Sequence, residues 1–215
     1  MLPLRRTVLI FSVLLNGANI ASAFDADPCF APTIKINEVI NALNADGWKT
    51  ANRNDPTVVD HVTWMGMPQY FAGDTGGQTV ESVLKIKRTS AQGILKKRDL
   101  EGAKTRILSR QTAGHTEVVK IAVVVLPRQY ASIHCSFSLH AGSIDSWPEF
   151  QMTNASGPEF LRLTSDAPNI PDAIASKDVV ALNVPALFAK VSIGPPSDAI
   201  VETYLSFLSK EKTND

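Results

Sequence analysis

The sequence predicts an α+β fold: a single domain with an antiparallel sheet around a hairpin at residues 118–139 and helices packed on one side. Two apolar runs, 118–126 and 131–139, are joined by a short segment that begins with Pro127, which is typical of a β-hairpin. Apolar residues near both ends of the chain recur at helical spacing. With 215 residues, 44% of them apolar, the chain is long enough to bury its own core.

Residues 1–23 have the order of features that defines a signal peptide. Arg5 and Arg6 precede a short apolar stretch, and small residues lead up to Ala23. The apolar stretch is well short of the ~20 residues that span a bilayer, which argues against a retained membrane anchor. We therefore expect cleavage after Ala23, export to the periplasm or out of the cell, and a soluble domain at 24–215.

Cys29 and Cys135 are the two cysteines of the chain, and only one disulfide connectivity is possible. In an oxidising compartment an even number of cysteines favours pairing over free thiols. The bridge would tie the start of the mature chain to the predicted hairpin. Because it would close a loop of about a hundred residues, the chain-entropy model gives it up to ~4.7 kcal/mol of stabilisation.

The first half of the mature chain predicts two helices and one ambiguous segment. Apolar residues from Ile36 to Leu43 recur at helical spacing, and Gly47 can end that helix in a left-handed conformation. Residues 57–71 predict a second helix. The segment 80–86 fits a helix and a strand equally well, and its structure stays open at this point.

Residues 99–110 are expected to form a further helix, because four apolar residues fall on one side of it and a turn at 112–114 ends it. The run 118–126 is almost continuously apolar, which suits a central strand covered on both faces. In 131–139 apolar and polar residues alternate strictly, so one face of that strand meets the core.

The last part of the chain predicts strands at 158–164, 178–184 and 187–193, followed by a C-terminal helix. Ser197 is the expected N-cap of this helix. Its expected buried stripe consists of Ile200, Tyr204, Phe207 and Leu208.

The charge of the chain selects no partner, but its distribution is uneven. Removal of residues 1–23 leaves 19 basic against 21 acidic residues. The segment 85–110 holds nine of those 19 basic residues and only two acidic ones. We expect an anion-binding surface that meets an anionic surface or an acidic protein, although a solvated face remains the alternative. Its predicted members are Lys96, Lys97, Arg98 and Lys104. Export and the lack of interleaved aromatic residues argue against nucleic acid.

No catalytic motif stands out in the sequence. The nearest arrangement for a hydrolase is His140, Ser143 and Asp145, but no Gly-x-Ser-x-Gly surrounds the serine. Asp145 and Glu149 flank Trp147 in a pattern that also suits a sugar site, without fixing the separation of the two carboxylates.

No metal or cofactor site is expected either. The four histidines do not converge in sequence, and His134 and His140 would lie about 20 Å apart along one strand. The glycine-rich segment 73–79 lacks the lysine of a phosphate-binding loop. Asn154 begins a glycosylation sequon, which matters only in a eukaryote.

Two functions remain open from the sequence. The first is a non-enzymatic envelope or secreted protein that acts as a binding or accessory module, with the basic stretch meeting an anionic partner. The alternative is a small secreted hydrolase whose site is assembled around His140, Ser143 and Asp145.

Overall fold

The computed structural model describes most of the chain after the predicted signal segment. The described residues are 25–68, 77–97, 99–100, 103–125, 130–144, 162–165, 167–182 and 194–209. Several predictions therefore lie outside the described residues: the signal segment 1–23, most of the glycine-rich segment, Arg98, Asp145, Trp147, Glu149, Asn154 and the predicted strand 187–193.

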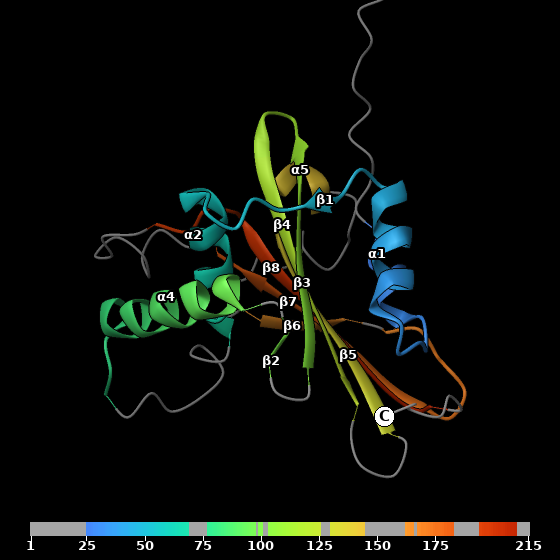
Figure 1. The fold of residues 1–215 in the computed structure, drawn as a ribbon. Helices are drawn as coiled ribbons and strands as arrows, with labels where there is room; N and C mark the ends of the chain where they lie inside the picture. Colours follow the sequence, from blue (N-terminus) through green and yellow to red (C-terminus); the bar gives the residue numbers. More distant parts are fainter. Residues whose placement is uncertain are drawn as a thin grey trace, which may run out of the picture.

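The described strands form one antiparallel sheet in the order β1-β3-β4-β5-β8-β7-β6, with β2 also paired to β3 (Figure 1). The predicted α+β fold and its central hairpin are confirmed, since β4 and β5 pair directly in the middle of the sheet. The strands are β1 (Lys49–Thr50), β2 (Asp99–Leu100), β3 (Ala103–Thr112), β4 (His115–Val125), β5 (Tyr130–Leu139), β6 (Arg162–Ser165), β7 (Ala173–Ala181) and β8 (Ala199–Leu208).

The sheet has two differently covered faces, because side chains alternate along each strand. Val119 of β4 pairs with Phe137 of β5, and both belong to one buried cluster. Val118, next to Val119, belongs to a second cluster on the other face, together with Ile200. The sheet therefore separates two hydrophobic cores.

Helices α2 (Pro56–Trp64) and α4 (Val80–Lys96) pack together on one side of the sheet (Figure 1). Asp55 caps α2 by accepting a hydrogen bond from the Thr57 amide at 2.8 Å, and Thr79 caps α4 in the same way. The ambiguous segment 80–86 is thus helical. Among the described helices, none has the length and apolar character needed to cross a bilayer.

The opposite face carries the 3-10 helix η1 (Asp27–Phe30) and helix α1 (Ile36–Ala45), whose buried residues join the cluster of Val119. Gly47 follows α1 with a φ of +84°, as expected for a left-handed cap. We name this layer of η1 and α1 the α1 layer, and the layer of α2 and α4 the α2–α4 layer.

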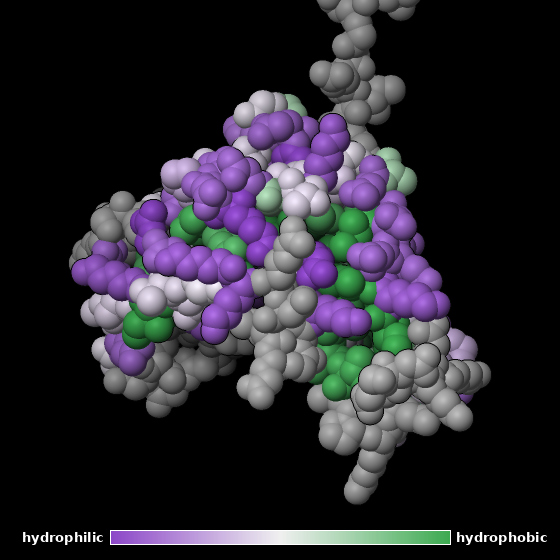
Figure 2. All heavy atoms as spheres, viewed as in Figure 1, coloured by the Kyte–Doolittle hydropathy of each residue, from purple (hydrophilic) through white to green (hydrophobic). Residues whose placement is uncertain are grey.

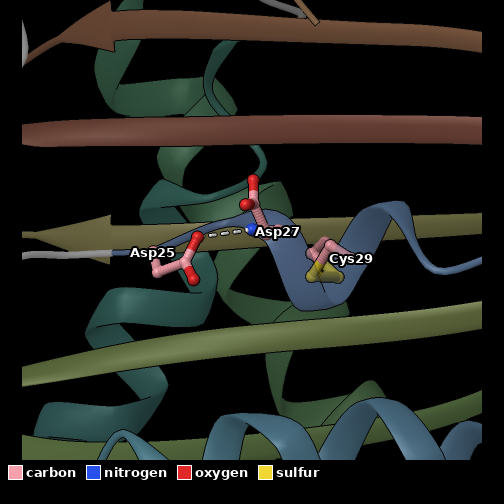
Figure 3. The surroundings of a disulfide bond; sticks show 4 residues. Asp25, Asp27 and Cys29 are labelled. Atoms are coloured by element: carbon pink, nitrogen blue, oxygen red, sulfur yellow. Dashed lines mark hydrogen bonds between the residues drawn. A yellow bond between two sulfur atoms is a disulfide. The ribbon is translucent and has the colours of Figure 1, made fainter. Parts of the chain in front are cut away.

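The predicted disulfide is present and fastens η1 to the centre of the sheet. Cys29 and Cys135 are bonded, with 6.2 Å between their Cα atoms. Figure 3 shows η1 in front of the strands, with Cys29 of the cystine on η1 and the Asp27 amide donating to Asp25. Both cysteines are fully buried, so the bridge belongs to the core of the α1 layer.

The prediction of a helix at 99–110 is wrong, because this segment contributes β2 and β3 to the sheet. Its adjacent apolar residues Ile107 and Leu108 are both buried, one on each face of the sheet. The turn at Ala113 and Gly114, which was expected to end a helix, has positive φ at both residues and joins β3 to β4. Two residues with positive φ are typical of a tight hairpin turn.

The prediction of a C-terminal helix is also wrong, because the residues after Ser197 form β8. Burial alternates along β8: Val201, Leu205 and Phe207 face the α1 layer. The apolar residues that were expected to form the buried stripe of this helix do recur at helical spacing. In the structure, however, β8 is paired along its length with β5 and β7. Tertiary pairing therefore decided a segment whose local pattern allowed both structures.

The remaining predicted strands are found with shifted limits. The structure has β6 at Arg162–Ser165, which overlaps the end of the strand predicted at 158–164, and β7 at Ala173–Ala181, which overlaps the start of the strand predicted at 178–184. A single helical turn, α5 (Ala141–Ile144), follows β5.

Candidate functional site

A buried chain of polar side chains connects α2 to the sheet. His61 Nδ1 lies 2.7 Å from Ser138 Oγ, and Ser138 Oγ lies 2.6 Å from Ser197 Oγ. All three residues are buried, and Ser138 is completely inaccessible. The strand β5 presents Ser138 to the α2–α4 layer because its chain neighbours Phe137 and Leu139 point to the α1 layer.

His61 is held in its neutral form. Burial and, to a smaller extent, the nearby His140 lower the pKa of His61 to about 4, and Asp55 opposes these effects. A neutral imidazole beside two hydroxyls resembles a serine and its general base. The arrangement is closed to substrate, however, since Ser138 has no exposed surface.

The predicted hydrolase residues lie at the end of β5. His140 Nδ1 is 3.4 Å from Asp198 Oδ2, and the same carboxylate oxygen accepts a hydrogen bond from the Ala141 amide at 2.8 Å. The carboxylate beside His140 in the described structure is therefore that of Asp198, and Asp145 lies outside the described residues. Ser143 is 1% exposed.

Ser143 is held near His140 by its backbone and not by its hydroxyl. The Ser143 amide donates to the His140 carbonyl at 3.0 Å, which closes the turn of α5. Within the described structure, the Ser143 hydroxyl has no hydrogen-bond partner. The geometry thus places an imidazole, a carboxylate and a serine in one region without offering an exposed nucleophile.

His140 interacts with two other histidines in this region, which the sequence analysis missed. The His115 and His140 rings stack with centroids 4.1 Å apart, and His140 affects the pKa of His61. The hairpin itself contained a signal, because antiparallel pairing brings the start of β4 and the end of β5 to the same edge. Even so, no three histidine, cysteine or acidic side chains of the described residues are arranged to hold a metal ion.

His134 lies on the sheet face that looks toward the α2–α4 layer. Its Nε2 atom is 3.7 Å from Glu202 Oε1, and 37% of the side chain is exposed. Burial of the rest of the ring and the charge of Lys120 lower the pKa of His134 below its usual value. Burial likewise lowers the pKa of Lys120, which Glu202 opposes. This cluster is a partly exposed polar patch and not a solvated histidine alone.

The predicted basic stretch is divided among three parts of the structure. Lys85, Lys96 and Lys97 are exposed on α4 and at its C-cap. Within the described residues, none of these three lysines takes part in a salt bridge. Figure 2 shows hydrophilic side chains over α4, with a small hydrophobic patch among them.

Two other cations of α4 turn inward. Arg88 Nη2 is 3.0 Å from Asp60 Oδ1 on α2, so that its charge is compensated. The stem of Lys87 lies over Gly66, where an added Cβ would be 2.9 Å from Lys87 Cδ. These two side chains connect α4 to α2 and leave the outward face to the exposed lysines.

Lys104 is close to the end of α4 along the backbone, since it pairs with Asp99 of β2, but its side chain lies on the α1 side of the sheet. It is exposed on β3 and, together with Ile34–Glu38 and Asn41, lines a surface depression of about 330 Å³ beside α1. The α1 layer covers the face opposite to α4 (Figure 1). Arg98, the fourth predicted member, lies outside the described residues.

Arg110, the last cation of the stretch, is buried. Its Nε atom donates to Glu117 Oε2 at 2.8 Å, and its guanidinium lies 4.6 Å from the centre of the Trp48 ring. Glu117 also accepts hydrogen bonds from the Thr112 hydroxyl and the His140 amide. The pair stabilises the edge of the α1 layer and offers no charge to a partner.

A second depression, of about 420 Å³, lies at the end of β8, with mostly apolar side chains around Asp172. Its other lining residues are Pro32, Ile34, Pro171, Phe207, Leu208 and Ser209. One carboxylate and one serine among apolar side chains do not single out a chemistry for this depression.

The fold and these sites define a disulfide-bonded α+β domain with a cationic helix on its surface. No family model, no curated protein and no solved structure matches the chain.

Proposed function

We propose that the chain is an exported, non-enzymatic binding module and that α4 engages an anionic partner. One observation carries the proposal: Lys85, Lys96 and Lys97 are exposed on α4 without an acidic partner among the described residues. We name this surface, together with the exposed Ile86, the α4 face.

The spacing of the lysines supports a continuous positive surface. Lys85 and Lys96 are eleven residues apart, which is close to three full helical turns, so both side chains leave the helix in nearly the same direction. The same spacing separates them by roughly 17 Å along the helix axis. Lys97 follows directly as the C-cap. Their summed field attracts polyanions and is screened over ~10 Å at moderate salt.

Export is part of the proposal and has its own support. The Cys29–Cys135 bridge suits an oxidising compartment, and residues 1–23 have signal-peptide features. Mass spectrometry of the protein recovered from the envelope or the medium should find a new N-terminus at Phe24. A full-length protein as the main species would contradict export by cleavage.

The binding experiment compares two charge-matched variants on a heparin-type resin at low salt. The variant Lys85→Gln, Lys96→Gln, Lys97→Gln should lose retention. The control Lys35→Gln, Lys49→Gln, Lys104→Gln removes three exposed lysines outside α4 and should keep it. Equal loss in both variants would show that only net charge matters and would contradict a specific α4 face.

A small hydrolase is the second candidate, favoured by the contact of the His140 imidazole with the Asp198 carboxylate. Such an enzyme would use Ser143 as nucleophile after opening of the α5 turn. A fluorophosphonate probe should then label the wild type and not Ser143→Ala. Absence of labelling, with retention on the resin intact, would leave the binding module alone.

A further inference from the structure

We propose that the partner of α4 is an anionic lipid surface, on which the α4 face docks with Ile86 in contact with the acyl boundary. This inference rests on the proposed function and names its partner. The lysines would lie among the headgroups, and the isoleucine would enter between them.

The first reason is the position of Ile86. This side chain is 55% exposed and directly follows Lys85 in the chain. At 100° per residue it points between the direction shared by Lys85 and Lys96 and that of the C-cap Lys97. An exposed apolar side chain beside a lysine gives α4 one group that can enter the boundary between headgroups and acyl chains, as the apolar residues of interfacial helices do.

The second reason is the shape of the surface. The two depressions described above lie beside α1 and at the end of β8, and no α4 residue lines either of them. The neighbours of Ile86 on the outward face are small: Thr89, Ser90 and Gly93. Among the described residues, the outward face of α4 thus carries small and charged side chains, and such a face suits an extended planar partner better than a ligand that needs a cleft.

The third reason is that α4 is fixed in this orientation. Leu84, Ala91 and Leu95 are buried against the sheet and α2, and Arg88 is paired with Asp60. The apolar face of α4 is therefore used within the domain. Contact with lipid has to be shallow and mostly electrostatic, and charge complementarity selects anionic headgroups over neutral ones.

The test measures co-sedimentation of the mature protein with vesicles. One set is phosphatidylcholine alone, and the other contains about one-third phosphatidylglycerol. We expect binding to the anionic vesicles only, lost at high salt. The triple glutamine variant of the α4 face should bind roughly 100-fold more weakly, since each lysine near such a surface contributes about fivefold.

A second pair of variants separates lipid from other polyanions. Ile86→Ser should weaken vesicle binding severalfold and leave retention on the heparin-type resin unchanged. The control Ile174→Ser removes a side chain that is 71% exposed on β7, and it should change neither measurement. Equal vesicle binding by Ile86→Ser and the wild type would overturn the role of Ile86.

The outcomes distinguish the two proposals. Retention on the resin without binding to anionic vesicles would overturn the lipid inference and leave the proposed function standing. If the protein neither is retained on the resin nor binds anionic vesicles, the proposed function is overturned as well. Equal binding to neutral and anionic vesicles would contradict recognition by charge.

Discussion

The two faces of the sheet are held by different kinds of interaction. On the face of the α1 layer, a disulfide joins η1 to β5, and a buried ion pair closes the edge beside Trp48. On the other face, α2 and α4 pack without a covalent link, and the polar contact of His61 with Ser138 is between neutral groups. The first face should therefore respond to reduction, and the second to acid.

The faces also differ in how far they are covered. The core of the α1 layer extends along β8 as far as Phe207. On the α2–α4 side the cluster ends near Ile200, and beyond it Tyr204, Leu208 and Ile174 are exposed. The α1 layer is shorter and is linked to the sheet by the disulfide. It nevertheless covers more of the sheet surface than the two longer helices of the α2–α4 layer do.

The largest loss of unfolding free energy is expected from Glu117→Ala on the face of the α1 layer. The substitution leaves the Arg110 guanidinium buried without its carboxylate, because the two side chains are 5% and 0% exposed. Loss of one partner of a buried ion pair lowers the free energy of unfolding by ~3–5 kcal/mol. Urea unfolding measures this value.

A double variant is the control for that prediction. Arg110→Met with Glu117→Leu removes both charges and should recover much of the lost stability. A loss below about 1 kcal/mol in Glu117→Ala would contradict a structural role of the pair.

The next effect concerns the covalent link. The variant Cys29→Ser, Cys135→Ser should lose ~2–4 kcal/mol of unfolding free energy. Hydrogen exchange should become faster in η1 and α1, while α2 and α4 keep their protection, since the bridge lies in the α1 layer. Equal acceleration in both layers would show that the two faces are not independent.

Low pH should lower the free energy of unfolding through His61, which lies on the face of the α2–α4 layer. Its pKa is about 4 in the folded protein, against 6.5 for a free histidine, so between these pH values the unfolded chain binds a proton that the folded one does not. The stability contributed by neutral His61 is complete above pH 6.5 and is lost as the pH falls toward 4. The loss is on the order of 3 kcal/mol.

Two variants test that dependence. His61→Gln should show a smaller decrease in unfolding free energy between pH 7 and pH 4.5. Ser138→Ala keeps the buried imidazole and should keep the decrease. If His61→Gln retains the full pH dependence, His61 is not its source.

The smallest predicted effects come from a matched pair of glycines and have opposite signs. Gly47→Ala puts a side chain at a φ of +84° after α1 and should destabilise by about 1 kcal/mol. Gly93→Ala lies inside α4, where an added Cβ meets nothing within 4 Å, and should stabilise by up to about 1 kcal/mol. Thermal unfolding of both variants measures the difference, and two shifts of the same sign would contradict it.

Much of the candidate site could not be predicted from the sequence. Lys96 and Lys97 are exposed, and the anion-binding role expected of them stays a prediction, whereas the side of the sheet on which Lys104 lies depends on which face β3 presents. The contact between His140 and Asp198 joins residues far apart in the chain. Such contacts follow from strand order, which local patterns do not contain.

The sequence by itself determined the features that depend on neighbouring residues. Strict alternation defined β5, helical spacing with Gly47 defined α1, and two cysteines allowed only one bridge. The tertiary structure alone decided that the segment after Ser197 is a strand, because its pairing with β5 and β7 outweighs a local pattern that suits a helix equally well. The physical reason is that β-structure draws its stability from partners distant in sequence, whereas a helix forms its hydrogen bonds within a few residues.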